Sequence, residues 1–274
     1  MQLDTQVAPI YFPEAGQSSV LRLGLQPLAM QDWIVVDNDL PLFHRHKLEQ
    51  KRLQFEEVYQ ELPESLPAQK EFCELLLQHL LNHHAGAYSV REGMLIHTAS
   101  QLNWEASTSS LWQASIWIQE DICILESADR QYRLAAASVC SPSNWSLKDK
   151  IGRSIDVIHG PVPGYQDQLS NRVVRLLDGI KPGKPVRRFN WSIQHGHELF
   201  WRADANAGNK LDAKYWRVER QTLLRLPETN AIVFGIRIFL HSFEIMRQHA
   251  EFNNNINAII DRLPTDQIKY KGLQ

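Results

Sequence analysis

The sequence predicts an α+β fold, and the spacing of its apolar residues leads to this prediction. In the first third of the chain, apolar residues recur three and four positions apart, which is the spacing of one helix face. Shorter apolar and β-branched segments with brief polar turns follow, then further helical segments, and then strands again. Successive strands joined by short turns pair antiparallel, so we expect an antiparallel sheet with flanking helices.

Two helices are expected in the N-terminal third. The first spans residues 43–59, and the second spans residues 68–83, where Phe72, Leu76 and Leu80 fall on one face. We interpret residues 1–90 as a helical N-terminal extension of one domain that comprises the whole chain, residues 1–274.

The remaining elements are expected in three groups. Three strands joined by short turns are predicted at residues 111–118, 122–126 and 132–139. Two helices are predicted next, at residues 147–152 and 167–177. Three further strands and a closing helix are predicted at residues 186–193, 216–224, 231–239 and 244–262.

Composition excludes several classes of protein. The formal net charge is -2, so the overall charge gives no support to nucleic-acid binding. The longest apolar run, residues 231–240, is too short for a membrane span and is interrupted by Arg237. Three cysteines without paired spacing argue against a disulfide framework and fit a reducing compartment, so we expect a cytoplasmic protein.

A histidine precedes a stiff loop inside the segment from Cys140 to Tyr165. The chain there reads Ile158-His-Gly-Pro-Val-Pro-Gly-Tyr165. The prolines fix the backbone φ angle, and the glycines permit close approach. Such a loop suits an axial haem ligand, because it can hold an imidazole nitrogen of His159 in one orientation. A histidine that caps a turn beside a helix would explain the same residues, so both interpretations stay open.

Charged side chains alternate along the strand expected at residues 216–224. Arg217 and Glu219 share one face of this strand, whereas Arg220 lies on the other. Charges on both faces of an internal strand are costly unless they are paired or bind a ligand. A structural Arg–Glu pair explains the pattern. So does a site in which an arginine binds a carboxylate, such as a haem propionate, and the glutamate binds a cation.

Other residues allow two interpretations each. Asn190 and Trp191 could line a pocket or pack in the core. Cys140 could serve as a thiolate haem ligand, but it ends an expected strand and lacks the surrounding cytochrome P450 pattern. We therefore expect Cys140 to be a small buried residue.

Four blocks of sequence occur in an order that resembles one known family. They are residues 140–152, 158–165, 188–193 and 217–227. Together they are similar to the haem-dependent oxidative N-demethylase, alpha-subunit-like, family. The resemblance extends over roughly residues 21–241, and the chain departs from the family pattern at His241-Ser-Phe243 and in residues 201–214.

The resemblance implies a PAS-like α+β domain that binds haem b and acts as a monooxygenase. Such an enzyme would demethylate a small amine such as dimethylamine and release formaldehyde. His159 matches the family histidine and would be the proximal iron ligand. Glu219 would face the protonated amine as a catalytic group, and Arg217 or Arg220 would hold haem propionates or bound oxygen. The remaining residues implied at the pocket are Tyr165, Asn190 and Trp191.

The expected partners follow from what the chain lacks. It contains no Gly-rich nucleotide loop and no flavin or iron–sulfur motif, so electrons would come from an external NADPH, flavin or iron–sulfur (ferredoxin-like) reductase. The other expected partners are a small amine substrate and dioxygen. We expect the protein to bind neither nucleic acid nor a membrane. The alternatives are a PAS-type haem sensor or carrier without turnover, and a PAS-like interaction module without haem.

Overall fold

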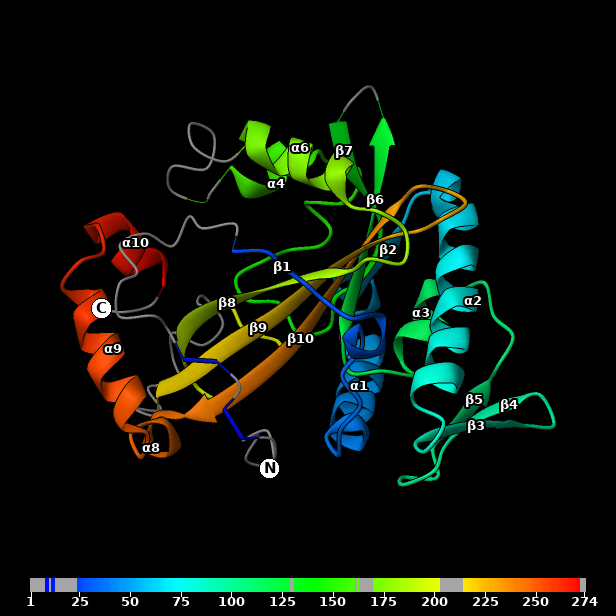
Figure 1. Cartoon of the computed structure of the whole chain (residues 1–274), viewed down its shortest axis with the longest axis horizontal. Helices are drawn as coiled ribbons and strands as arrows, with labels where there is room; N and C mark the ends of the chain where they lie inside the picture. Colours follow the sequence, from blue (N-terminus) through cyan, green and yellow to red (C-terminus); the bar gives the residue numbers. More distant parts are fainter. Residues whose placement is uncertain are drawn as a thin grey trace.

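The computed structural model describes residues 8–9, 11–12, 24–128, 131–160, 162, 170–202 and 214–271. A seven-stranded antiparallel sheet in the order β1-β8-β9-β10-β6-β7-β2 forms its centre (Figure 1). Its strands are β1 Gln26–Pro27, β2 Tyr59–Glu61, β6 Asp121–Ala128, β7 Gln131–Ser138, β8 Val186–His195, β9 Lys214–Arg225 and β10 Ile232–Ser242. A three-stranded sheet consists of β3 Tyr88–Arg91, β4 Met94–His97 and β5 Asn103–Glu105.

Helices flank the large sheet, so the α+β prediction is confirmed. The α-helices are α1 Leu40–Val58, α2 Leu66–His83, α3 Leu111–Ser115, α4 Ile155–His159, α6 Ser170–Gly179, α8 Phe243–Met246, α9 Ala250–Ile260 and α10 Thr265–Tyr270. Short 3-10 helices occur at η1 Met30–Asp32 and η2 Pro63–Ser65. In the described part of the chain, no helix combines the length and apolar character that a membrane crossing requires.

Three element predictions are wrong in part. Residues 111–115 form the helix α3 instead of a strand, because the Ser110 hydroxyl caps the backbone N–H of Gln113 and Leu111 packs in the core. Residues 147–152 form hydrogen-bonded turns that end at a left-handed Gly152, with φ of +74°. The closing helix is divided into α8 and α9, because His249 has an extended backbone between them.

The two faces of the sheet are covered by different helices. Asn190, Glu219 and Ile238 are cross-strand neighbours, so their side chains share one side, which we call the Glu219 face. Over the end of this face near β6 and β7, α4 and α6 pack Ile155 and Leu177 into one apolar cluster. The opposite side, which we call the Arg220 face, packs against α2 and α3 at one end and α9 at the other (Figure 1).

The helix α1 lies beside the part of β10 that β6 leaves uncovered. Pairing between β6 and β10 covers Ile232 to Ile236 of β10, and Phe43 of α1 packs against Ile238 beyond that point. The buried Arg237 guanidinium lies 4.2 Å from the centroid of the Phe43 ring. Asp39 pairs with the same guanidinium at 3.0 Å, so this buried charge is compensated.

Candidate functional site

The histidine predicted as a ligand ends the short helix α4. Ser154 caps the start of this helix by accepting a hydrogen bond from the Val157 N–H. At the other end, Nδ1 of His159 lies 2.9 Å from the carbonyl oxygen of Ile155. A carbonyl can only accept, so Nδ1 donates the hydrogen bond. The tautomer with a proton on Nδ1 carries its lone pair on Nε2, as an imidazole that coordinates iron through Nε2 requires.

The surroundings of His159 favour its neutral form. His159 is an exposed residue, yet the protein around its ring limits the solvation of the imidazole and lowers the pKa of His159. The hydrogen bond to Ile155 opposes this shift, and the positive charge of Arg188 adds to it. Arg188 lies on β8 directly opposite Gln221 of β9, and therefore on the Glu219 face. A cation of this face, Arg188, therefore has an electrostatic effect on His159.

Glu219 is the centre of a hydrogen-bonded network on this face. Its Oε2 accepts from Nδ2 of Asn190 at 3.0 Å and from Nε2 of Gln221 at 2.9 Å. Its Oε1 lies 3.6 Å from Nε of Arg217. Burial alone would raise the pKa of Glu219, but the charge of Arg217, the two hydrogen bonds and the charge of Lys271 together lower it. The lowered pKa favours the ionised carboxylate of Glu219. The side chain is 17% exposed, so this carboxylate is not fully enclosed.

Arg217 is held by other groups of the protein. Its guanidinium is fully buried and donates to the carbonyl oxygen of Leu199 and to Oε1 of Gln194, both at 3.3 Å. A further hydrogen bond of 2.5 Å goes to the carbonyl oxygen of Ser141. The Ser141 backbone N–H in turn donates to Asp121 at 2.8 Å. Arg217 thus connects Glu219 to a buried polar interior.

Two of the predicted site residues lie on the other side of the sheet. Arg220 is on the Arg220 face and donates to the carbonyl oxygens of Trp33, at 3.2 Å, and Asp32. Trp191 alternates with Asn190 along β8 and stacks on Trp216 with the ring centroids 4.9 Å apart. The structure therefore brings His159, Asn190, Arg217 and Glu219 to one face and does not bring Arg220 or Trp191 there. Tyr165 lies outside the described residues.

Sequence reasoning assigned no role to two residues near Glu219. Arg188 shares its strand face with Asn190, so alternation along residues 186–193 could have revealed it. Lys271 is buried against Asn190 and Trp191, 80 residues away in sequence or more. No local pattern distinguishes Lys271 from an ordinary surface lysine.

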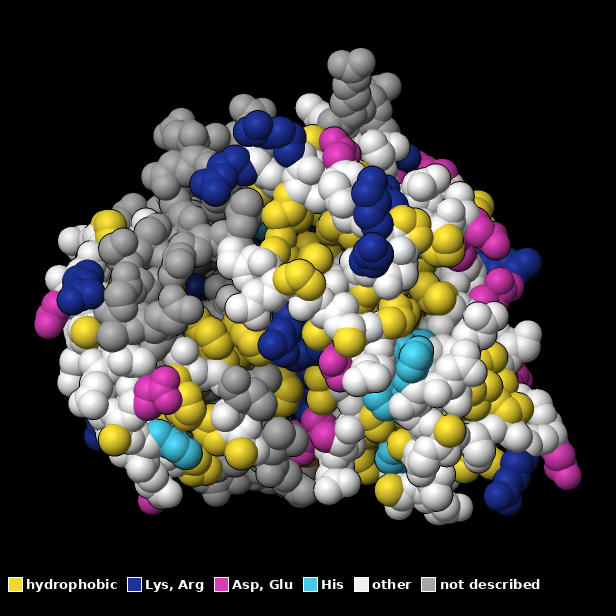
Figure 2. All heavy atoms as spheres, in the orientation of Figure 1, with side chains coloured by type: hydrophobic (Ala, Val, Ile, Leu, Met, Phe, Trp, Pro, Cys, Tyr) yellow, Lys and Arg dark blue, Asp and Glu magenta, His cyan; other side chains and the backbone are white. Residues whose placement is uncertain are grey.

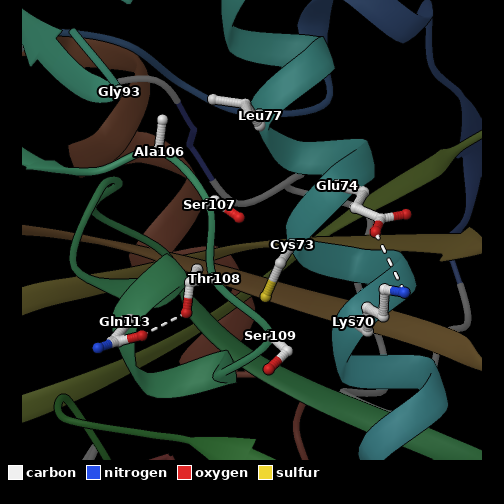
Figure 3. A pocket seen from close by; sticks show the side chains of 10 residues that line it. All are labelled: Lys70, Cys73, Glu74, Leu77, Gly93, Ala106, Ser107, Thr108, Ser109 and Gln113. Carbon is white, nitrogen blue, oxygen red and sulfur yellow. Dashed lines mark hydrogen bonds and ion pairs between the residues drawn. The ribbon is translucent and has the colours of Figure 1, made fainter.

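The pocket drawn in Figure 3 is separate from this face and has a volume of about 560 Å³. It lies between α2, with Lys70, Cys73 and Glu74, and the segment around Thr108. Burial raises the pKa of the Cys73 thiol to about 12, so Cys73 is not available as a thiolate ligand. Burial also raises the pKa of Cys140, which fits the expectation that Cys140 is a buried thiol.

Several exposed basic side chains lie on α6 and in the loop that follows it. Figure 2 shows Lys and Arg atoms at the upper rim of the surface, where Figure 1 places α6. Arg172 and Arg175 of α6 are exposed, as are Lys181 and Lys184 in the loop that follows. A positive surface of this kind favours anionic groups nearby.

The fold and site define an α+β protein in which a histidine with a lowered pKa ends a helix packed over a sheet that carries a partly buried carboxylate. Residues 24–274 match the family model described as haem-dependent oxidative N-demethylase, alpha subunit-like. Because the match extends over most of the sequence, the chain belongs to this family. Membership implies a haem-dependent, oxidative N-demethylase-like function, and the alpha-subunit-like character of the family implies association with other subunits.

Proposed function

We propose that this chain binds haem b through His159 and oxidatively demethylates a small methylated amine such as dimethylamine. The observation that carries the proposal is the hydrogen bond from Nδ1 of His159 to the Ile155 carbonyl, beside a face whose carboxylate stays ionised. The residues fit the cofactor, because a neutral imidazole with its lone pair on Nε2 is the ligand that haem iron takes. We further propose that residues 1–274 form one haem-binding PAS-like domain, as the family implies, with residues 1–90 as its helical N-terminal extension.

Glu219 is the group proposed to bind the substrate. A secondary amine is protonated near neutral pH, and an ammonium group leaving water needs a compensating negative charge. The lowered pKa of Glu219 keeps that charge available. Asn190 and Gln221 both donate to Oε2, whereas Oε1 lies on the Arg217 side, 3.6 Å from Nε of that residue.

The arginines have different proposed roles. Arg188 is the cation with the largest electrostatic effect on His159, so it is the arginine that we assign to a haem propionate. Arg217 stabilises the Glu219 carboxylate from the interior. Arg220 and Trp191 support the sheet from the Arg220 face, and Tyr165 is retained as a proposed pocket residue.

Bound haem would supply the oxygen activation, and the protein would supply ligation and substrate placement. The overall change consumes one amine, one dioxygen, two electrons and two protons. It yields the demethylated amine, formaldehyde and water. The two electrons require a reductase, which we propose to be a separate NADPH-dependent flavin or iron–sulfur protein.

The first test is an absorption titration of the purified chain with haem. We expect a Soret band that changes in His159→Ala and is unchanged in His195→Ala, a control on an exposed histidine at the end of β8. An identical spectrum in His159→Ala would exclude this histidine as the ligand. No Soret band at all in the wild type would exclude haem binding.

The second test measures formaldehyde released from dimethylamine with an artificial reductant. We expect formaldehyde from the wild type, and a rate reduced about tenfold or more in Glu219→Gln, which loses the charge and keeps the shape. Haem binding without formaldehyde would favour the alternative of a sensor or carrier.

A further inference from the structure

Lys271 is a buried lysine whose side chain reaches the network around Glu219. It follows α10, and its carbonyl oxygen accepts a hydrogen bond of 2.8 Å from the N–H of Ile193. This backbone contact holds the end of the described chain against β8. The Lys271 residue is only 3% exposed, and its Nζ lies 4.9 Å from the centroid of the Trp191 ring.

The ammonium group of Lys271 has two hydrogen-bond acceptors on β8. It donates to the carbonyl oxygen of Trp191 at 2.5 Å and to Oδ1 of Asn190 at 2.7 Å. The other end of the same Asn190 amide, Nδ2, donates to Oε2 of Glu219 at 3.0 Å. A continuous chain of hydrogen bonds therefore runs from Lys271 through Asn190 to Glu219.

The chemistry of these groups allows one orientation of the amide. In its protonated form Lys271 can only donate, so it must face Oδ1 of Asn190. Nδ2 must then face Glu219, where a donor stabilises the carboxylate. A rotation of the amide by half a turn would bring Oδ1 against Oε2 of Glu219, which is repulsive, and would leave Lys271 facing Nδ2. Lys271 thus reinforces, from the far end of the amide, the orientation of Asn190 that supports an ionised Glu219.

Burying the Lys271 ammonium group at this position costs desolvation free energy. Burial lowers the pKa of Lys271 to about 7, the negative charge of Glu219 opposes this shift, and the positive charge of Arg188 adds to it. An apolar side chain of similar length would pack against Trp191 without this desolvation cost. A structural role in packing alone therefore does not account for an ammonium group at this place.

We propose that Lys271 is a positioning residue that acts through the Asn190 amide to hold the Glu219 carboxylate ready for a substrate ammonium group. The part concerning substrate rests on the proposed function. The part concerning orientation does not, because it involves only groups of this chain.

The orientation is tested by nitrogen-15 NMR of asparagine side-chain amides in the full-length protein as purified. Asn190→Leu assigns the Asn190 signal by its disappearance. We expect the Asn190 amide protons to be shifted in Lys271→Met and unchanged in Lys181→Met, a control at an exposed lysine. An Asn190 signal that does not move in a folded Lys271→Met protein overturns the proposal.

The link to substrate is tested by dimethylamine titration of the haem-loaded protein, followed by absorption. We expect Lys271→Met and Asn190→Leu each to raise Kd about tenfold, the effect of one hydrogen bond to a charged group. The double variant should show no further loss, because both changes remove the same path. Additive losses, or an unchanged Kd in Asn190→Leu, overturn the proposal.

The two experiments separate this inference from the function itself. If the wild type does not bind dimethylamine but the Asn190 signal still depends on Lys271, the proposed function fails and the positioning role stands. Should Lys271→Met not fold, Asn190→Leu and Lys271→Arg, which keeps the donors, are measured instead. In a folded Lys271→Arg protein, the Asn190 amide signal should stay near its wild-type position. A signal that leaves this position also contradicts the positioning role.

Discussion

Lys47 provides the sharpest test of how the buried charges support this fold. Its Nζ is fully buried and donates to the carbonyl oxygens of Ser115, Ile118 and Glu120 at 2.8, 3.2 and 2.5 Å. Asp121 is the anionic group with the strongest electrostatic effect on it. The ammonium group therefore fixes the segment that connects α3 to β6. The perturbation is Lys47→Met, which keeps the length of the side chain and removes both the charge and the donors.

The expected loss of stability follows from these contacts. Each buried acceptor that loses its donor costs about 1–3 kcal/mol, and the Asp121 carboxylate would also lose the favourable charge of Lys47. The two costs overlap, and the methionine gains some packing, so we expect the free energy of unfolding to fall by about 4 kcal/mol. Whole domains are stable by about 5–15 kcal/mol, so this loss is a large fraction of the total.

The assay is urea unfolding followed by circular dichroism, with Lys70→Met as the matched control. Lys70 is exposed and its ion pair with Glu74, at 3.8 Å, lies on the surface of α2. Its loss should change the free energy of unfolding by less than about 0.5 kcal/mol. The reasoning is refuted if Lys47→Met and Lys70→Met differ by less than about 1 kcal/mol.

Three further predictions concern stability. His79 is 2% exposed, and its pKa is lowered to about 3, mainly by burial. As pH falls from about 6.5 towards 3, His79 therefore takes up a proton in the unfolded chain but not in the native state, which lowers the stability of the native state. His79→Phe should therefore raise Tm more at pH 5 than at pH 8, by an amount equivalent to at most about 2 kcal/mol, and equal shifts at both pH values would contradict this. Gly235→Ala should lower stability by about 1–3 kcal/mol in urea unfolding, because its Cβ would lie 2.8 Å from Oγ1 of Thr222. Arg237→Met should cost about 3–5 kcal/mol in the same assay, because Asp37 and Asp39 would lose their common cation, and a stability equal to wild type would refute the pairing.

Secondary structure was predictable where apolar residues recur with one clear spacing, either every second residue or every three to four residues. The alternation in β8, β9 and β10 and the helical spacing in α2 are present in the sequence, and the structure confirms these elements. Residues 111–118 were assigned wrongly because a short apolar run fits a strand and a buried helix equally well. The deciding feature is tertiary, since α3 contacts both α2 and β7.

The candidate site was predictable only in part, because strand alternation separates residues that are adjacent in sequence. The blocks containing His159, Asn190 and Glu219 were found from the chain alone, and so was the fact that Arg217 and Arg220 point to opposite faces. Alternation does not say which face the helices leave for a site. The face that remains open depends on where α4 and α9 pack against the sheet. The local spacing of apolar residues does not determine this packing.

The sequence by itself determined the α+β class, the family and a histidine placed before a segment rich in proline and glycine. These are properties of local spacing and of ordered motifs. Only the tertiary structure decided that Arg217 faces the interior, and that Lys271 reaches Asn190 across 81 positions of sequence. The physical reason is that a buried charge is placed by partners far away along the chain. Such partners meet only after the strands have paired and the C-terminal helices have packed.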